Sequence, residues 1–148
     1  MSLELNKLKK AFSKKLLFEN LSYSFPDSGI FAIVGNSGAG KTTLLRMIAG
    51  LDTSYGGEIV GGGVKNVSYV FQEYRLFPTA TALENVLLGK GGSAVEQDEK
   101  NAFELLISLG FKAEEVNLLP GELSGGMKQR VAVARAIMKD AQIILLDE

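Results

Sequence analysis

The stretch "GNSGAGKTT", residues 35–43, fits the phosphate-loop pattern G-x-x-x-x-G-K-[ST]. Gly38 and Gly40 let the backbone wrap closely enough for its N–H groups to surround phosphate oxygens, and the start of a helix adds a favourable dipole. Lys41 would bridge the outer phosphates and the Thr42 hydroxyl would ligate Mg²⁺. The alternative is a glycine-rich turn before an ordinary helix. The predicted nucleotide-binding residues are Gly35, Asn36, Ser37, Gly38, Ala39, Gly40, Lys41, Thr42 and Thr43.

The segments on either side of this loop predict a strand and a helix. "IFAIV", residues 30–34, is a continuous apolar run, which is typical of a strand buried on both faces of a parallel sheet. "KTTLLRMIAG", residues 41–50, has apolar residues at helical spacing and ends at a glycine. Upstream, Leu21, Tyr23 and Phe25 alternate with serines, which is the pattern of a half-buried strand.

The rest of the chain continues with further strands and helices. Short strands are predicted at residues 56–60 and 67–71, and helices at residues 81–89, 98–110 and 126–139. "AQIILLDE", residues 141–148, is an apolar strand that ends in two carboxylates. Together these elements predict one layered α/β domain.

The final acids form the second half of the predicted site. A buried strand would deliver Asp147 to the C-terminal edge of a sheet, where ligands collect. With Lys41 upstream, Asp147 is expected to hold Mg²⁺ through water and Glu148 to polarise the attacking water. Taken alone, an apolar run that ends in acids is a commonplace pattern.

Composition narrows the class of protein. The 148 residues include 16 Lys and Arg against 17 Asp and Glu, a formal net charge of −1, so nothing suggests electrostatic binding to nucleic acid. The absence of cysteine excludes disulfides and cysteine–zinc clusters, and the absence of histidine removes the commonest general base. No apolar run approaches the roughly 18 residues that span a bilayer, and the first residues lack the apolar core of a signal peptide. We expect a chain that does not cross a membrane itself but can sit against a membrane protein.

A second anion site is predicted at "LSGGMKQR", residues 123–130. Adjacent glycines cost conformational entropy and contribute no packing, so their place before a helix needs a reason. Ser124, Gly125 and Gly126 lie at a helix start, where free N–H groups and the dipole favour an anion. The alternative is a glycine cap followed by an unrelated helix.

The order of these motifs resembles that of the ATP-binding cassette (ABC) ATPases, the nucleotide-binding subunits of ABC transporters. The matching segments are "GNSGAGKT", Gln72 in "YVFQE", "LSGGMKQR" and "ILLDE". The resemblance implies a P-loop NTPase fold with an N-terminal antiparallel β part and a helical subdomain. It divides the single domain into a β part and nucleotide core at residues 1–78, a helical subdomain at 79–126, and a signature helix with the last strand at 127–148.

The resemblance also implies roles for individual residues. ATP and Mg²⁺ are the cofactors, and a head-to-tail dimer binds each ATP between the loop of one subunit and Ser124, Gly125 and Gly126 of a second copy. Phe12 stacks on adenine, unless it is a core phenylalanine. Gln72 reaches Mg²⁺ and senses the membrane subunit, unless it is a surface glutamine. Glu148, Lys41 and Gln72 form the catalytic set, and Mg²⁺ is held by Thr42, Gln72 and Asp147.

The implied partners are transmembrane permease subunits, contacted by residues 75–77, and for an importer an extracytoplasmic solute-binding protein. The chain would then lie at the cytoplasmic face of the membrane. Residues 69–89 look most like the nitrate, sulfonate and taurine import group, although Thr79 stands where that group commonly has tryptophan. The alternatives are a soluble cassette that transports nothing, and a generic P-loop kinase, which would not need "LSGGMKQR". Fewer than about 90 residues separate Lys41 from Ser124, too few for coiled-coil arms.

Family cassettes continue beyond the equivalent of Glu148 with another strand, a switch histidine and terminal helices. By resemblance, that strand inserts between residues 30–34 and the last strand. We therefore expect the sequence to be a piece of a longer subunit, with unpaired strand edges and little ATPase activity by itself.

Overall fold

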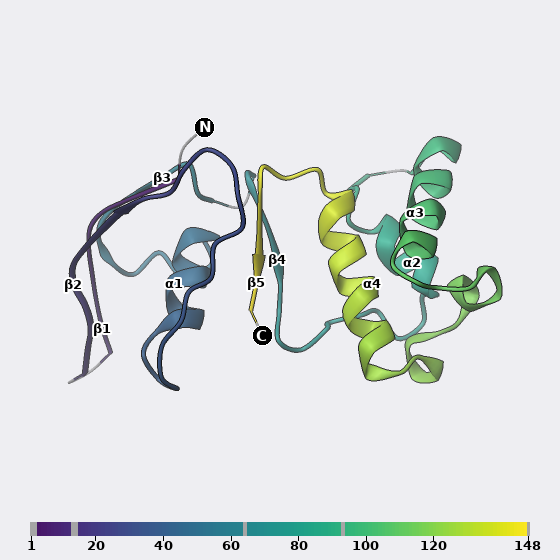
Figure 1. The fold of residues 1–148 in the computed structure, drawn as a ribbon, viewed down its shortest axis with the longest axis horizontal. Coiled ribbons are helices and arrows are strands. Elements are labelled where there is room, and N and C mark those ends of the chain that lie inside the picture. Colours follow the sequence, from purple (N-terminus) through teal and green to yellow (C-terminus); the bar gives the residue numbers. More distant parts are fainter. Residues whose placement is uncertain (1–2, 13–14, 64, 93, 148) are drawn as a thin grey trace. The chain divides into compact units, whose positions relative to one another are not determined.

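The computed structural model describes residues 3–12, 15–63, 65–92 and 94–147. These form two compact units, residues 1–67 and 68–148, whose helices and strands are labelled in Figure 1. Each unit combines strands with helices, so the predicted α/β class is confirmed.

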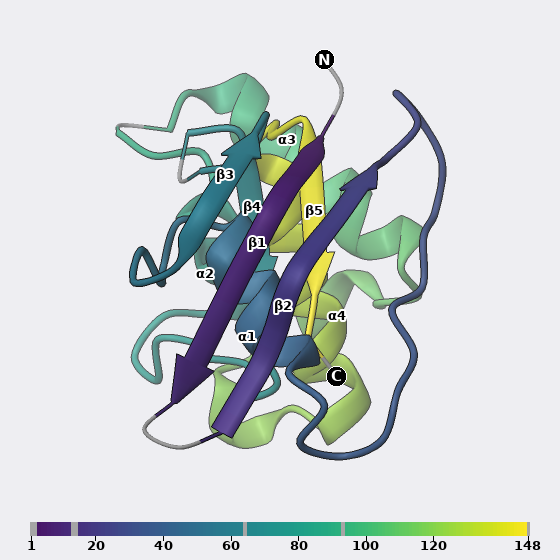
Figure 2. The same ribbon diagram turned by 90° about the vertical axis from the view of Figure 1, so that its left-hand side faces the viewer.

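The first unit contains a three-stranded antiparallel sheet in the order β2-β1-β3. Figure 2 shows these strands side by side, with helix α1 (Lys41–Ile48) behind them. The central strand β1 (Glu4–Phe12) pairs with β2 (Lys15–Ser24) on one side and β3 (Gly56–Val60) on the other. The register places Phe12 directly opposite Lys15 at one end of the β1–β2 pair.

The core of the first unit comes from β1, on both sides of a register shift between Leu5 and Leu8, and from one face of α1. Leu5 and Leu8 of β1 are almost fully buried, as are Met47 and Ile48 of α1. Each such side chain stabilises the fold by roughly 1.5–3 kcal/mol relative to an exposed position. The helix predicted from apolar spacing is thus confirmed, whereas β1 was not predicted from the sequence.

The predicted buried strand at residues 30–34 is wrong. These residues form no strand in the described part of the chain, and their apolar side chains face solvent. Ile30 is 102% exposed and Val34 is 89% exposed. An apolar run becomes a buried strand only where neighbouring strands satisfy its backbone groups and other layers cover its two faces. Among the described residues, no strand pairs with residues 30–34 and no second layer covers their side chains.

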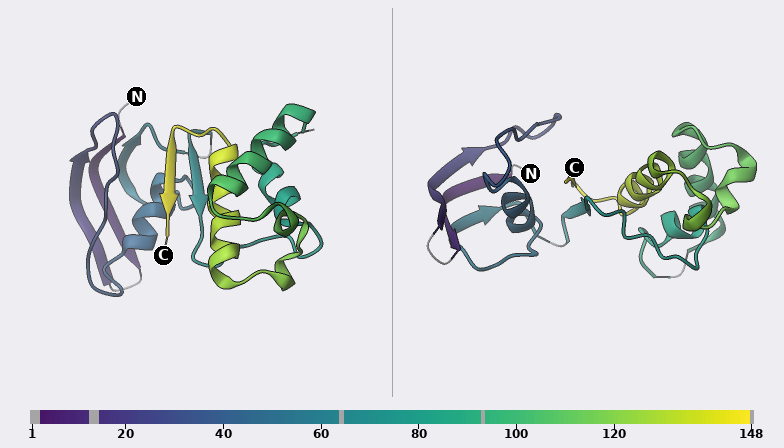
Figure 3. Two further views of the ribbon diagram at one scale, coloured as in Figure 1. Left: turned by 45° about the vertical axis from the view of Figure 1, so that its right-hand side comes forward. Right: turned by 90° about the horizontal axis from the view of Figure 1, so that it is seen from below.

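The second unit contains a two-stranded sheet of β4 (Val67–Val70) and β5 (Ile143–Leu146). The left-hand view of Figure 3 shows both strands running in the same direction. Val70 of β4 packs against Ala132 and Ala136 of helix α4 (Gly125–Met138). The strands predicted at residues 67–71 and 141–148 are therefore confirmed, each slightly shorter than expected.

The helices of the second unit gather into one cluster, seen in the right-hand view of Figure 3. They are α2 (Ala82–Leu87), α3 (Glu96–Ser108) and α4, with short 3-10 helices η1 (Ala113–Asn117) and η2 (Pro120–Glu122) before α4. None of the helices in the described residues is both long and apolar enough to cross a membrane. The shared core consists of Ala82, Val86, Ala102, Leu106, Phe111, Val116, Leu123, Val131 and Ala134.

All three predicted helices of this unit are confirmed. Helix α2 begins where predicted because Thr81 and Glu84 cap it reciprocally: the Thr81 hydroxyl accepts from the Glu84 N–H, and the Glu84 carboxylate accepts from the Thr81 N–H. Helix α3 begins two residues earlier than predicted because the Asp98 carboxylate accepts from the Val95 N–H at 3.0 Å. Side-chain capping thus sets both helix starts.

A buried asparagine fixes the segment that leads into α2. The Asn85 side chain is fully buried, and its oxygen accepts from the Phe77 N–H at 2.8 Å. Its amide nitrogen donates to the carbonyls of Phe77, Ala80 and Thr81. This network holds residues 77–81 against α2, in the segment that follows Gln72.

Candidate nucleotide-binding site

Residues 35–40 form an exposed loop that leads directly into α1. Gly38 and Gly40 adopt positive φ angles of 76° and 100°, a conformation that favours glycine. A Cβ added to Gly40 would also lie only 2.8 Å from the Phe18 ring of β2. Both glycines are therefore needed for the path of this loop.

The Lys41 side chain folds back over the loop from the first turn of α1. Its ammonium donates to the Gly35 carbonyl at 2.8 Å and to the Asn36 carbonyl at 3.2 Å. Thr42 and Thr43 follow in the same helical turn, where backbone N–H groups lack intrahelical acceptors. The loop therefore combines an ammonium with the positive end of a helix, an arrangement suited to phosphate.

Strand β2 contacts the same loop from its other side. The Lys15 ammonium donates to the Gly38 carbonyl at 3.2 Å, and Phe18 and Leu17 lie against the Gly40 position. Lys15 belongs to no recognisable motif in the sequence and was not among the predicted site residues. Its contact joins residues 23 positions apart, and it depends on the packing of β2 against the loop.

Phe12, the predicted adenine-stacking residue, is the last residue of β1 and is 50% exposed. It is therefore not a core phenylalanine. The Lys10 ammonium lies 4.8 Å from the ring centroid, a distance at which a cation is attracted to an aromatic face. The exposed ring surface is available to a planar ligand.

The lysine beside this ring is itself held by an acid. Lys10 is 4% exposed, and its ammonium contacts both Asp52 carboxylate oxygens, at 2.7 and 2.9 Å, and donates to the Ser54 carbonyl. The hydrogen bond from Lys10 is the largest cause that lowers the pKa of Asp52 below its ordinary value. Asp52 therefore holds the Lys10 ammonium in place beside Phe12.

In the second unit, Asp147 follows β5 directly. Its N–H donates to the Val70 carbonyl at 3.0 Å, and its carboxylate accepts from the Tyr69 hydroxyl at 2.7 Å. Tyr69 was not among the predicted site residues, because a phenol within an apolar strand pattern predicts burial and not a partner 78 residues away. Gln72 lies exposed just after β4. Glu148, the predicted water-polarising residue, lies outside the described residues.

The predicted second anion site is the start of α4. Ser124 caps the helix, since its hydroxyl accepts from the Met127 N–H at 3.3 Å. A Cβ added to Gly126 would meet nothing within 4 Å, and one at Gly125 would meet only the Tyr74 hydroxyl, at 3.5 Å. Packing among the described residues therefore does not require either glycine, so the bare backbone needs another explanation.

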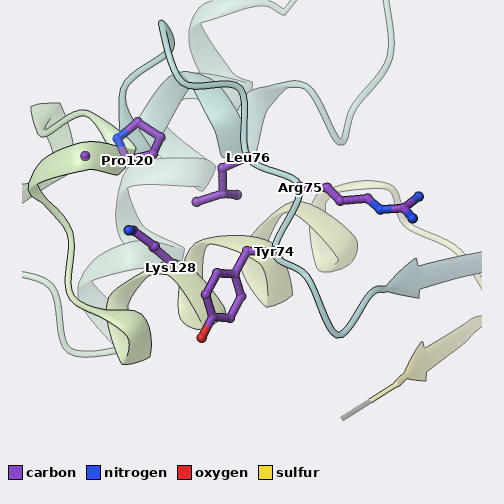
Figure 4. A pocket seen from close by; sticks show the side chains of 6 residues that line it. Tyr74, Arg75, Leu76, Pro120 and Lys128 are labelled. Carbon is purple, nitrogen blue, oxygen red and sulfur yellow. The ribbon is translucent and has the colours of Figure 1, made fainter.

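A shallow cavity of about 280 Å³ lies between the segment after Gln72 and the start of α4. Figure 4 shows Leu76 and Lys128 beside it, with the Arg75 side chain extending away. Two of the three residues predicted to contact a permease, Arg75 and Leu76, belong to its lining. The cavity is lined by Tyr74, Arg75, Leu76, Pro120, Gly121 and Lys128.

An arginine of α4 fixes one wall of this cavity. The Arg135 guanidinium donates to the Arg75 carbonyl at 2.8 Å and to the Tyr74 carbonyl at 3.0 Å. Burial lowers the pKa of Arg135 from its ordinary value. The segment after Gln72 is thus tied to α4, the helix that begins with Gly125.

Comparisons with known proteins agree on one family. A family model described as "ABC transporter" matches residues 18–148. The chain is 38% identical over 160 residues to the aliphatic sulfonates import ATP-binding protein SsuB of Bacillus cereus, covering 100% of the chain and 62% of that protein. It is 37% identical over 159 residues to the xylose/arabinose import ATP-binding protein XacJ of Haloferax volcanii, covering 99% of the chain and 41% of that protein.

A solved structure shares the fold. It is the dimeric post-hydrolysis state of the ATP-binding cassette MJ0796 bound to ADP and Pi, with a TM-score of 0.84 and 30% identity. The match covers 99% of the present chain and 73% of that chain. The chain spans 62% of the length of SsuB and 41% of that of XacJ.

Proposed function

The chain belongs to the ABC transporter family, and on that premise we propose that it is the ATP-binding subunit of an ABC importer, which binds and hydrolyses ATP to drive transport. The observation that carries the proposal is the loop at residues 35–40, with two positive-φ glycines and the Lys41 ammonium folded over it. The ADP and Pi bound to the related cassette MJ0796 support a nucleotide ligand.

Each site residue has a role in this proposal. Lys41 and the N–H groups around Gly38 and Gly40 bind and orient the phosphates, while Phe12 offers its exposed ring to the adenine. When bound, Mg²⁺ would neutralise charge on the phosphates, and Thr42, Gln72 and Asp147 are the residues that would hold it. Tyr69 orients the Asp147 carboxylate through its hydroxyl. Glu148 would activate the attacking water.

The start of α4 supports a dimer in which two copies share each nucleotide. Gly125 and Gly126 leave the helix start bare although the chain's own packing does not require it. A phosphate from a nucleotide on a second copy would fit such a start, because it brings negative charge to free N–H groups. The dimeric state of MJ0796 agrees with this arrangement.

The cavity beside Leu76 and Lys128 is the proposed contact with a transmembrane permease subunit. Such a contact would hold the subunit at the cytoplasmic face of the membrane, with an extracytoplasmic solute-binding protein on the other side. SsuB is an importer component for sulfonates, which favours a sulfonate or another small oxyanion as cargo. The importer relatives also favour transport over the alternative of a soluble cassette, and co-purification with a permease distinguishes the two.

The test is nucleotide binding by the full-length protein, measured by calorimetry. Lys41→Ala removes a charge-assisted contact to phosphate, worth roughly 1.5–3 kcal/mol, so the affinity for ATP should fall at least tenfold. The matched control is Lys9→Ala, which removes an exposed lysine on β1. Equal ATP affinity in wild type and Lys41→Ala would refute the proposed site.

A further inference from the structure

We propose that Lys15 is a second phosphate-contacting cation of the nucleotide site, an inference that rests on the proposed function. Lys15 is the first residue of β2, and its ammonium lies 3.2 Å from the Gly38 carbonyl, within the loop that Lys41 covers. The loop is therefore approached by two ammonium groups, one from the strand and one from the helix.

The backbone of Lys15 is held beside the loop by its neighbours on β2. Two neighbours on the same strand, Leu17 and Phe18, lie against the Gly40 position, so the start of β2 is held beside the loop. Lys15 is also the cross-strand partner of Phe12, whose half-exposed ring is the proposed adenine contact. Lys15 thus lies where the base end and the phosphate end of a nucleotide would meet.

Hydrogen-bond chemistry favours a contact between the Lys15 ammonium and a phosphate oxygen of a bound nucleotide. In the structure it donates to a neutral carbonyl, whereas a phosphate oxygen is a charged and stronger acceptor. An ammonium has three donors, so it can keep the Gly38 contact while it binds a phosphate. The side chain is exposed and can reorient without leaving a core position empty.

The experiment compares Lys15→Gln, Lys15→Arg and Lys9→Gln in the full-length protein, by calorimetric titration with ADP and ATP at low and high salt. Glutamine retains a donor for the Gly38 carbonyl but carries no charge, so its effect reports the charge. Lys9→Gln removes the same charge from β1, where Lys9 pairs with Gly56 of β3. Thermal unfolding without nucleotide checks that each variant is folded.

We expect Lys15→Gln to weaken binding of both nucleotides by about fivefold and to make binding less salt-dependent. Lys15→Arg and Lys9→Gln should bind as the wild type does. Wild-type affinity and salt dependence in Lys15→Gln, together with a loss of binding in Lys41→Ala, would overturn this inference and leave the proposed function intact. Failure of the wild type to bind either nucleotide would overturn both.

Discussion

Two lysines of the first unit have different roles, although Lys10 lies near the end of β1 and Lys15 is the first residue of β2. Lys10 is buried and held by Asp52 and the Ser54 carbonyl, so its charge is a fixed part of the fold beneath Phe12. Lys15 is exposed, and its ammonium donates to the Gly38 carbonyl of the loop. The first stabilises the unit, and the second is free to serve a ligand.

The Lys10–Asp52 pair predicts how stability depends on pH. Because the folded-state pKa of Asp52 is lowered, its contribution is present above the unfolded value of about 3.9 and is lost as the pH falls through the folded value. Asp52→Asn should therefore lower stability near pH 7 by about 1–3 kcal/mol, since it leaves Lys10 buried without its carboxylate. It should also flatten the loss of stability below about pH 4.

Urea unfolding at a series of pH values measures this effect. Asp140→Asn is a suitable control, because Asp140 is exposed and has a φ of 54°, which asparagine tolerates. If Asp52→Asn and wild type gave parallel stability profiles down to pH 3, the pair would contribute nothing through ionisation.

Individual site residues could be predicted where the chemistry is local in sequence. The positive φ angles of Gly38 and Gly40 agree with the loop pattern, and Ser124 lies at the start of α4, as predicted from "LSGGMKQR". Lys15 and Tyr69 could not be predicted, because their contacts cross 23 and 78 residues. The first depends on the packing of β2 against the loop, and the second on the pairing of β4 with β5. A buried lysine such as Lys10 leaves no signal in the sequence either.

At the scale of elements, helical spacing and closing glycines predicted helices well, and apolar runs predicted strands less reliably. Helices carry their hydrogen bonds within the segment, so Thr81 and Glu84 suffice to define where α2 begins. A strand needs partners from elsewhere in the chain. Residues 30–34 have the composition of a buried strand and yet form none among the described residues.

The bare start of α4 predicts a separation between folding and dimerisation. Gly126→Asp in the full-length protein should leave monomer stability unchanged or slightly higher, because its side chain meets open space and an acid suits a first helical turn. The same charge would repel the phosphate of a nucleotide on a second copy. ATP-driven dimerisation, measured by light scattering, should therefore be abolished.

Gly121→Asp provides the control. A Cβ added at Gly121 also meets nothing within 4 Å, and Gly121 lies in η2, before the start of α4. Normal ATP-driven dimerisation of Gly126→Asp would show that the glycines have another purpose. Loss of dimerisation in both variants would show an effect of charge alone.

At the scale of the whole molecule, the proposed site residues belong to both units. Phe12 and residues 35–43 lie in the first unit, whereas Gln72, residues 124–126 and Asp147 lie in the second. Binding of phosphate by the loop requires residues of the first unit only. Hydrolysis by the proposed mechanism requires residues of both.

The exposed segment before the loop predicts how a polypeptide of residues 1–148 behaves by itself. Val34, immediately before the loop, is exposed and belongs to no strand in the described residues, so the loop lacks a sheet anchor on that side. Catalysis of phosphoryl transfer depends on positioning and electrostatics. We expect Mg²⁺-dependent ATP turnover at least about 100-fold below that of the full-length protein, together with binding of a dye that reports exposed apolar surface. Equal turnover by the two proteins would contradict this prediction.

The open space at Gly126 has a consequence for attempts to improve the protein. Alanine is a better helix former than glycine by about 1 kcal/mol, and nothing within 4 Å would resist its methyl group. Selection of a variant library for thermal stability would therefore enrich Gly126→Ala. If the bare helix start exists to receive a second copy's nucleotide, the enriched variants would be robust proteins that turn over less ATP. Thermal stability would then favour alanine at position 126, whereas transport would favour glycine.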